Sequence, residues 1–413
     1  MALPPSDGPT SRFAAFQHKS FALYWAARFA STFSVQIVSV AVGWQVYDIS
    51  RDPFDLGLVG LLQFAPALLL MFATGAAADR YNRRTIMALG MIVEAMCTGF
   101  LIAFTLAGAP SVLPIFVTLI VFGTARAFFN PAQSSLVVNL VPQEALSNAI
   151  AWNSSAWQVA TIVGPVAGGL LYGVSPIAAY GAASVMFLAG TGFVLAIPQP
   201  AQRTTREPAS WKTVIAGLSY IRREKVVLGA ISLDLFAVLL GGATALLPVY
   251  ARDILDLGPW GLGLLRAAPG VGAVAMAVFL AMSPIRSRAG FLMFICVFSF
   301  GAFTVVFGLS TTVWVSIVAL ALMGAFDMVS VFVRETLIQL WTPDEVRGRV
   351  NAVNMVFVGA SNELGEFRAG VMATLIGTVA AVVVGGMGTM AVAALWAKMF
   401  PDLRRIQHLE SRD

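Results

Sequence analysis

The chain has 413 residues, of which 58% are hydrophobic and only 11% are charged, and its formal net charge is +5. A soluble domain typically carries about 25% charged residues, so the composition excludes an ordinary water-soluble protein. The basic residues lie between apolar runs rather than in one patch, which argues against a nucleic-acid partner.

Apolar runs of about 20 residues recur along the chain, and each is long enough to cross a bilayer as a helix. The sequence predicts twelve such spans, at 22–47, 55–78, 85–107, 112–137, 147–172, 177–197, 226–251, 260–283, 289–309, 313–340, 349–374 and 378–400. Most connections between them are short. The polar stretch 198–225 is the exception, and it separates six spans from six.

The two halves of the chain echo each other. Residues 60–66 read Gly-Leu-Leu-Gln-Phe-Ala-Pro, and residues 263–269 read Gly-Leu-Leu-Arg-Ala-Ala-Pro. Further along, residues 142–169 align with residues 343–370. A half-chain repeat in an apolar protein predicts two similar helix bundles with a substrate site between them. We therefore predict an all-α membrane protein whose twelve transmembrane helices form two pseudo-symmetric six-helix bundles.

The predicted organisation has five parts. An N-terminal tail (1–21) precedes the first bundle (22–197), a central loop (198–225) leads to the second bundle (226–400), and a C-terminal tail (401–413) follows. Within the central loop, apolar and basic residues alternate at helical spacing, which is typical of a helix that lies on the membrane surface.

Basic residues predict the orientation of the chain, because cytoplasmic segments of membrane proteins are enriched in Lys and Arg. With the N-terminus in the cytoplasm, the opposite face holds only Arg51 and Arg252. We therefore predict a multi-pass protein of the cytoplasmic (inner) membrane with both termini in the cytoplasm. The basic residues then on the cytoplasmic side include Arg12, Lys19, Arg80, Arg83, Arg84, Arg203, Arg206, Lys212, Arg222, Arg223, Lys225, Arg286, Arg288, Arg347, Arg349, Lys398, Arg404, Arg405 and Arg412.

The loop between the second and third spans reads Gly75-Ala-Ala-Ala-Asp79-Arg80-Tyr-Asn-Arg83-Arg84. It resembles the signature loop of the major facilitator superfamily, Gly-x-x-x-Asp-Arg-x-x-Arg-Arg, and lies between the expected spans. An Asp at a helix end can receive the positive end of another helix, and arginines pair with carboxylates. We expect these five residues to form a conformational latch at the cytoplasmic face. The alternative is a basic loop that only sets topology.

The fifth span contains Gly164-Pro165-Val-Ala-Gly168-Gly169. This run resembles the Gly-Pro-x-x-Gly-Gly core of the antiporter motif of the same superfamily. Small residues let helices approach closely, and proline bends a helix. The resemblance favours export over uptake. The alternative is ordinary helix packing.

The resemblance extends from Phe16 to about Phe400. Within the superfamily the chain is similar to the branch that contains the enterobactin exporter and macrolide efflux proteins, on the residues 27–29, 342–343 and 348–351. It implies two six-helix bundles around a midplane cavity, alternating access, a small-molecule substrate and a functional monomer. The branch contains both siderophore and drug exporters, so it does not imply one substrate.

Ionisable residues inside a predicted span are costly in lipid and are therefore functional candidates. Proton coupling needs a carboxylate that takes up and releases a proton as access alternates. Asp234 and Asp327 are the first candidates, because the resemblance places the seventh and tenth spans at the cavity. Glu363 and Glu366, which share a helix face, and Glu94 are further candidates. The alternative for Asp234 and Asp327 is structural pairing within the second bundle.

The fourth span places Arg126, Asn130 and Gln133 on one helix face. The repeat maps Arg126 onto Asp327, and the resemblance puts both at the cavity from opposite halves. The alternative for Arg126 is a structural ion pair with Glu94. The superfamily has an Arg-x-x-x-Gly pattern on this span, but here the glycine position is Asn130, so a proton-transfer role for Arg126 does not carry over.

Three other residues are candidates for the substrate cavity. Arg266 stands three residues before a proline, and the same holds for Gln63 at the equivalent repeat position. Either can bond to backbone freed by the proline, whereas Arg266 can also contact an anionic substrate or form an outer gate. Gln36 on the first span can reach the cavity, and Phe236 can stack on a ring of a substrate.

Several motifs are missing from the sequence. It has no Walker A motif, and Cys97 and Cys296 lie in apolar runs without a neighbouring His, so we expect no cofactor, no metal and no enzyme activity. The predicted function is proton-coupled antiport that exports a drug- or siderophore-like organic molecule. The alternatives are an uptake symporter or facilitator of a metabolite or lysolipid, or a non-transporting membrane receptor or scaffold.

Overall fold

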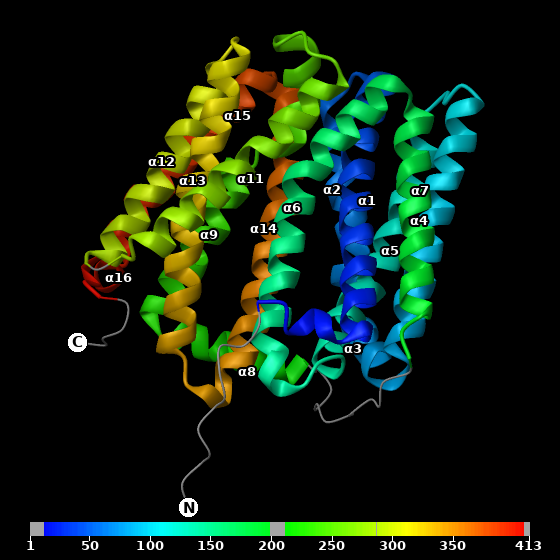
Figure 1. The fold of residues 1–413 in the computed structure, drawn as a ribbon. Helices are drawn as coiled ribbons and strands as arrows, with labels where there is room; N and C mark the ends of the chain where they lie inside the picture. Colours follow the sequence, from blue (N-terminus) through cyan, green and yellow to red (C-terminus); the bar gives the residue numbers. More distant parts are fainter. Residues whose placement is uncertain (1–11, 199–210, 286, 409–413) are drawn as a thin grey trace, which may run out of the picture.

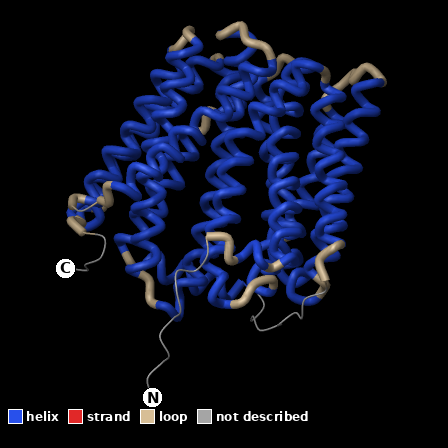
Figure 2. The backbone as a smooth tube through the Cα atoms, in the orientation of Figure 1, coloured by secondary structure: helices blue, strands red, loops and turns tan. Residues whose placement is uncertain are grey.

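The computed structural model describes residues 12–198, 211–285 and 287–408, and these form helices joined by short loops, with no strand among them (Figures 1 and 2). Parts of the predicted tails and central loop, with Arg203, Arg206, Arg286 and Arg412, lie outside the described residues. The prediction of an all-α membrane fold is confirmed.

Three helices of the first half begin at a residue whose side chain caps the helix N-terminus. The Asp52 and Asn82 side chains accept hydrogen bonds from the first backbone N–H groups of α2 and α4, and Ser175 does the same for α7. The helices are α1 (Lys19–Ser50), α2 (Pro53–Leu69), α3 (Met71–Arg80), α4 (Arg83–Leu106), α5 (Leu113–Leu136), α6 (Gln143–Val174) and α7 (Pro176–Leu195).

The second half begins after the helix α8 (Trp211–Arg223), which belongs to the predicted central loop. The helices that follow are α9 (Lys225–Gly241), α10 (Leu247–Val249), α11 (Pro259–Met282), α12 (Ala289–Leu309), α13 (Val313–Trp341), α14 (Asp344–Ile376), α15 (Thr378–Met399) and α16 (Pro401–Arg405). That α8 lies on the membrane surface stays a prediction.

Ten spans among the described residues are long and apolar enough to cross a membrane, and α2 with α3, bent by 58°, makes an eleventh. The one predicted span still to be matched, 349–374, corresponds to α14, which has 33 residues. It does not meet the same test of hydropathy because it carries polar residues along its length, including Glu363, Glu366 and Arg368. The polarity of α14 is therefore the feature that separates it from its neighbours.

The helices pack into two groups. In one, α1 packs against α6 and α7, and α4 packs against α5 and α7; in the other, α12 packs against α13 and α15, and α11 against α13. The groups meet where α2 contacts α14 and where α6 contacts α11. The helices α3, α8 and α16 lie at one end of the molecule, which we call the terminal end, and the opposite end is the far end (Figure 1).

The predicted span 226–251 is not one helix. α9 ends at Gly241, and a 3-10 turn (Thr244–Leu246), the short α10 and a π-helical turn (Tyr250–Ile254) follow. Pro248 in α10 has no backbone N–H to donate to a continuing helix. The break turns Thr244 and Pro248 toward a cavity between the two helix groups.

Candidate functional site

A cavity of about 240 Å³ lies between the two helix groups. One wall comes from α1, α2 and α6, and the other from α11, α14 and the broken segment after α9. The lining residues are Gln36, Ser39, Gly43, Leu56, Val59, Gly60, Gln63, Thr161, Pro165, Thr244, Ala245, Pro248, Arg266, Glu363 and Glu366. All three ionisable side chains in this lining come from the second half of the chain.

Arg266 crosses the junction between the groups. From α11, its guanidinium donates a hydrogen bond to the hydroxyl of Ser39 on α1. Its Nε is buried and has no hydrogen-bond partner among the described residues. A buried guanidinium with a donor to spare is a binding group for an acceptor or an anion.

Glu363 and Glu366 face the same cavity from α14. They stand three residues apart, which puts them on one helix face. A methyl group added at Gly60 of α2 would touch both carboxylates, so the two converge on one point of the opposite wall. Within the described part of the chain, neither forms an ion pair. Such carboxylates can bind a proton or a cationic group.

The antiporter-like run of α6 lies at the junction itself. A Cβ atom added at Gly164 would lie 2.6 Å from the Cβ of Gln36, and one at Gly168 would lie 2.9 Å from the Cα of Ile37, so these glycines press α6 onto α1. On the other side of α6, a Cβ at Gly169 would lie 2.5 Å from the carbonyl oxygen of Pro259 on α11. Pro165 of the run lines the cavity, and its carbonyl oxygen would lie 2.5 Å from a Cβ atom added at Gly263 of α11.

The signature loop makes its contacts inside the first half. Arg83 is buried, lies 3.9 Å from Asp79, and donates hydrogen bonds to the carbonyl oxygens of Ala78 (3.1 Å) and Ser135 (2.9 Å). Arg84 donates to the carbonyl oxygen of Ile197. Arg80 is exposed at the terminal end, and a Cβ at Gly75 would meet no neighbour. In this conformation the loop therefore braces α4 against α5 and α7.

A second group of charges lies inside the second half. Asp234 of α9 and Arg334 of α13 form an ion pair, and both residues are buried, at 6% and 3% exposure. Glu335 lies 3.6 Å from the Nε of Arg334 and accepts a hydrogen bond from Asn354 at 3.0 Å. Asp327 lies on the same helix as Arg334. Neither Asp234 nor Asp327 lines the cavity described above.

An ion pair with a fully buried carboxylate lies inside the first half. Arg126 of α5 donates a hydrogen bond to Glu94 of α4 at 3.3 Å, and Glu94 is fully buried. This is the pairing that the sequence offers as the alternative for Arg126. Asn130 is exposed, and the backbone carbonyl of Gln133 accepts a bond from Tyr24. Neither of these two residues lines the cavity between the groups.

Phe236 of α9 packs on Trp396 of α15, with ring centroids 5.2 Å apart, and is 39% exposed. It does not line the cavity between the groups. In the described part of the chain, no three His, Cys, Asp or Glu side chains are placed to hold a metal ion.

Sequence reasoning did not select several neutral lining residues, among them Ser39, Gly60, Thr161 and Thr244. A signal for part of this set was present. The repeated segments 60–66 and 263–269 both line the cavity, the first through Gly60 and Gln63 and the second through Arg266. The repeat of segment 60–66 in segment 263–269 therefore marks the two walls of the cavity.

Comparisons with known proteins agree with this architecture. The enterobactin exporter EntS of Escherichia coli O1:K1 / APEC is 27% identical over 405 residues, which is 94% of each chain. EntS of Shigella boydii serotype 18 is 26% identical, with the same coverage.

Solved structures show the same fold. A bacterial homologue of the iron transporter ferroportin, in an inward-facing state, is 16% identical with a TM-score of 0.70, covering 93% of this chain and 98% of that chain. A bacterial homologue of the human lysosomal transporter Spinster, inward-facing and occupied, is 15% identical with a TM-score of 0.69, covering 96% and 99%. The profile of the family described as transmembrane secretion effectors matches residues 10–412. The chain therefore belongs to the transmembrane secretion effectors of the major facilitator superfamily, which are membrane transporters and not enzymes.

Proposed function

We propose that this transporter exports a small organic molecule from the cytoplasm in exchange for protons, by alternating access. The observation that carries the proposal is the cavity between the helix groups, where Arg266, Glu363 and Glu366 meet beside Pro165 of the antiporter-like run. A site between two bundles is opened to one side or the other when the bundles rock. Carboxylates without an ion-pair partner at that point suit proton exchange.

The orientation follows from the basic residues. The terminal end faces the cytoplasm, because Arg80, Arg83 and Arg84 and the basic α8 lie there. The far end then faces outward. Contacts between α2 and α14 and between α6 and α11 join the groups, whereas the contacts of the signature loop stay within one group. We infer that the cytoplasmic side is open in this conformation. We also propose that the protein functions as a monomer.

Each candidate residue has a proposed role. Glu363 and Glu366 exchange protons, and Arg266 holds an anionic or acceptor group of the substrate from the same cavity. Asp234 and Asp327 stay secondary candidates for proton coupling. The signature loop closes the cytoplasmic side when the bundles rock, since only then can Asp79 and Arg83 reach the second half.

Further residues keep their proposed roles. Glu94 stays a secondary candidate for proton coupling. The substrate is proposed to meet Arg126, Asn130, Gln133 and Phe236 on the cytoplasmic path that leads to the cavity. The glycines of α6 let the groups pivot at a tight contact.

The substrate is proposed as a drug- or siderophore-like amphipathic molecule. Two observations support this class. The relatives at 26–27% identity are named as exporters of enterobactin. The cavity offers a cation and two carboxylates beside neutral amide and hydroxyl groups, which suits a polar organic molecule rather than an alkyl chain.

Inside-out vesicles with an imposed proton gradient test the proposal. With the vesicle interior acidic, we expect accumulation of a fluorescent dye or a catecholate siderophore that stops when an ionophore collapses the gradient. Vesicles that contain the Glu363→Gln/Glu366→Gln protein serve as the control. Entry that follows the substrate gradient alone, unaffected by the ionophore, would show a facilitator and contradict the proposal. If no compound of a broad panel entered these vesicles faster than empty vesicles, the remaining alternative would be a non-transporting receptor or scaffold.

A further inference from the structure

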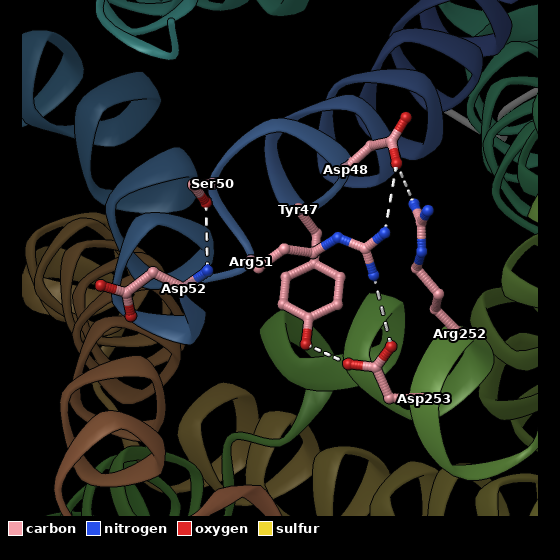
Figure 3. A network of polar contacts seen from close by, with 7 residues as sticks. All are labelled: Tyr47, Asp48, Ser50, Arg51, Asp52, Arg252 and Asp253. Atoms are coloured by element: carbon pink, nitrogen blue, oxygen red, sulfur yellow. Dashed lines mark hydrogen bonds and ion pairs between the residues drawn. The ribbon is translucent and has the colours of Figure 1, made fainter.

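The two arginines that break the charge pattern of the chain meet at the far end. Arg51 and Arg252 stand alone on the face that is otherwise poor in basic residues. In the structure both belong to one set of polar contacts with Tyr47, Asp48 and Asp253, which we call the far-end network (Figure 3). The membrane topology therefore does not account for the position of these two arginines, whereas their ion-pair partners do.

The far-end network alternates in charge. Arg252 pairs with Asp48, the guanidinium of Arg51 lies 3.8 Å from Asp48 and 3.6 Å from Asp253, and the hydroxyl of Tyr47 donates to Asp253 (Figure 3). Two arginines and two aspartates are equal in number, so the set needs no counter-ion from outside. The charges balance only when the residues at the end of α1 and those of the turn after α10 are in contact.

The network joins the two helix groups. Tyr47, Asp48 and Arg51 belong to the end of α1, whereas Arg252 and Asp253 belong to the π-helical turn that follows α10. The local backbone fits this role on both sides. Arg51 ends α1 in the left-handed region with φ of 56°, and a π-helical turn re-aims successive side chains at functional sites.

Two neighbouring contacts reinforce the same junction. The guanidinium of Arg252 lies 5.4 Å from the centre of the Trp44 ring on α1, a cation–π distance. The Asp52 carboxylate caps α2 through Phe54 at 2.9 Å and also accepts a hydrogen bond from Thr374 of α14 at 3.0 Å. Opening the far end therefore breaks several polar contacts at once.

We propose that the far-end network is a reversible latch that holds the outer side closed and sets the resting state of the transporter. This inference rests on the alternating access of the proposed function. Side-chain exposures of 25–51% mean that each pair is weak on its own. A set of weak pairs biases a two-state equilibrium and still releases when substrate binding favours the other state. The signature loop lies at the opposite end of the molecule, so the far-end network is separate from it.

Charge reversal with restoration tests the latch. A reporter Thr244→Cys is placed at the cavity in a background of Cys97→Ala and Cys296→Ala, and its labelling by a membrane-impermeant maleimide is measured from the outer side. We expect Asp48→Arg or Arg252→Asp to raise the labelling rate roughly three- to tenfold, since each removes pairs worth up to about 1 kcal/mol. The double variant Asp48→Arg/Arg252→Asp re-forms this one pair with its charges exchanged but still lacks the contact of Arg51 with Asp48, so labelling should fall below the rate of either single variant without returning fully to that of the reporter alone.

Matched controls separate the latch from general effects. Asp344 and Arg347 form an exposed pair within α14 at the terminal end, so Asp344→Arg and Arg347→Asp should leave labelling unchanged. Where a reversal fails to fold, Tyr47→Phe and Thr374→Val remove single crossing bonds and should raise labelling by about twofold. Unchanged labelling in the single variants, or a double variant as open as either single, overturns the proposal. Labelling needs no substrate or proton gradient, so its failure is distinct from a failure of the transport assay.

Discussion

The second half of the chain gathers charge in two places that differ in how the charges are partnered. Asp234 and Arg334 form a sealed ion pair between α9 and α13 within one helix group. Glu363 and Glu366 line the cavity between the groups, opposite Gly60, without an ion pair among the described residues. The first arrangement fixes charge in place, because separating a buried pair is costly. The second leaves charge available to a proton or a substrate.

The sealed pair should govern stability. Arg334→Ala leaves the buried carboxylate of Asp234 without its partner, and breaking such a pair costs about 3–5 kcal/mol of folding free energy. We expect a large fall in the thermal unfolding temperature in detergent. Adding Asp234→Asn removes the orphaned charge and should recover most of the loss. If Arg334→Ala lowered the free energy of unfolding by less than about 1 kcal/mol, this pair would behave like an exposed ion pair, and the contrast with the cavity carboxylates would be lost.

The cavity pair should govern coupling instead. Glu363→Gln and Glu366→Gln keep shape but cannot exchange a proton, and loss of an interaction with a charged group, about 1.5–3 kcal/mol, corresponds to roughly 10- to 100-fold slower gradient-driven transport. Unfolding temperatures should stay near that of the parent.

Glu345→Gln is the control for these variants, because Glu345 is an exposed carboxylate at the start of the same helix α14. It should leave both transport and stability unchanged. If the cavity variants were to destabilise the protein as strongly as Arg334→Ala while retaining pH-driven transport, the two sites would have exchanged roles.

Crowding the cavity carboxylates should give a smaller effect. Gly60→Ala places a methyl group against both Glu363 and Glu366, and overpacking costs about 1–3 kcal/mol, at the lower end here because glutamate side chains can move. We expect the apparent affinity for substrate to fall about threefold to tenfold in a transport assay.

Gly99→Ala in α4 is the matched change, because a Cβ there meets no neighbour. Alanine is the better helix former by about 1 kcal/mol, so this variant should fold at least as well as the parent and transport normally. Equal loss of affinity in both variants would show that helix flexibility, and not the carboxylates, sets the effect of Gly60→Ala.

The sequence carried enough information for the fold. Apolar run length, the spacing of the signature loop and the Gly164–Gly169 run are local patterns, and local patterns survive into the structure as helices and helix contacts. The residues that line the cavity could be predicted only in part. The repeat identifies equivalent positions, but it does not say which way each side chain points.

Side-chain partners are therefore where the sequence falls short. Arg126 and Asp327 are equivalent by repeat, but the structure pairs Arg126 with Glu94, which the sequence offers only as an alternative, and pairs Asp234 with Arg334. The break of the seventh span at Gly241 also has no periodic signal, although it brings Thr244 to the cavity. Both outcomes depend on contacts between helices that lie tens of residues apart in the sequence, and helix packing determines these contacts.

The smallest effect should come from Ser39, the only first-half side chain that is hydrogen-bonded to the ionisable groups of the cavity among the described contacts. Ser39→Ala removes the acceptor of the Arg266 guanidinium and keeps the charge of that guanidinium, so the variant loosens the binding group without removing it. If Arg266 holds the substrate, an unanchored guanidinium should weaken apparent affinity about two- to tenfold with little change in maximal rate. Ser34→Ala on the same helix is the control, because that hydroxyl donates to the carbonyl oxygen of Ala30 at 2.8 Å and, in the described part of the chain, to no ionisable group. A change in the proton-gradient dependence of Ser39→Ala, rather than in its affinity, would mean that Arg266 acts on Glu363 and Glu366 and not on the substrate, and the cavity would then be a single coupled charge cluster.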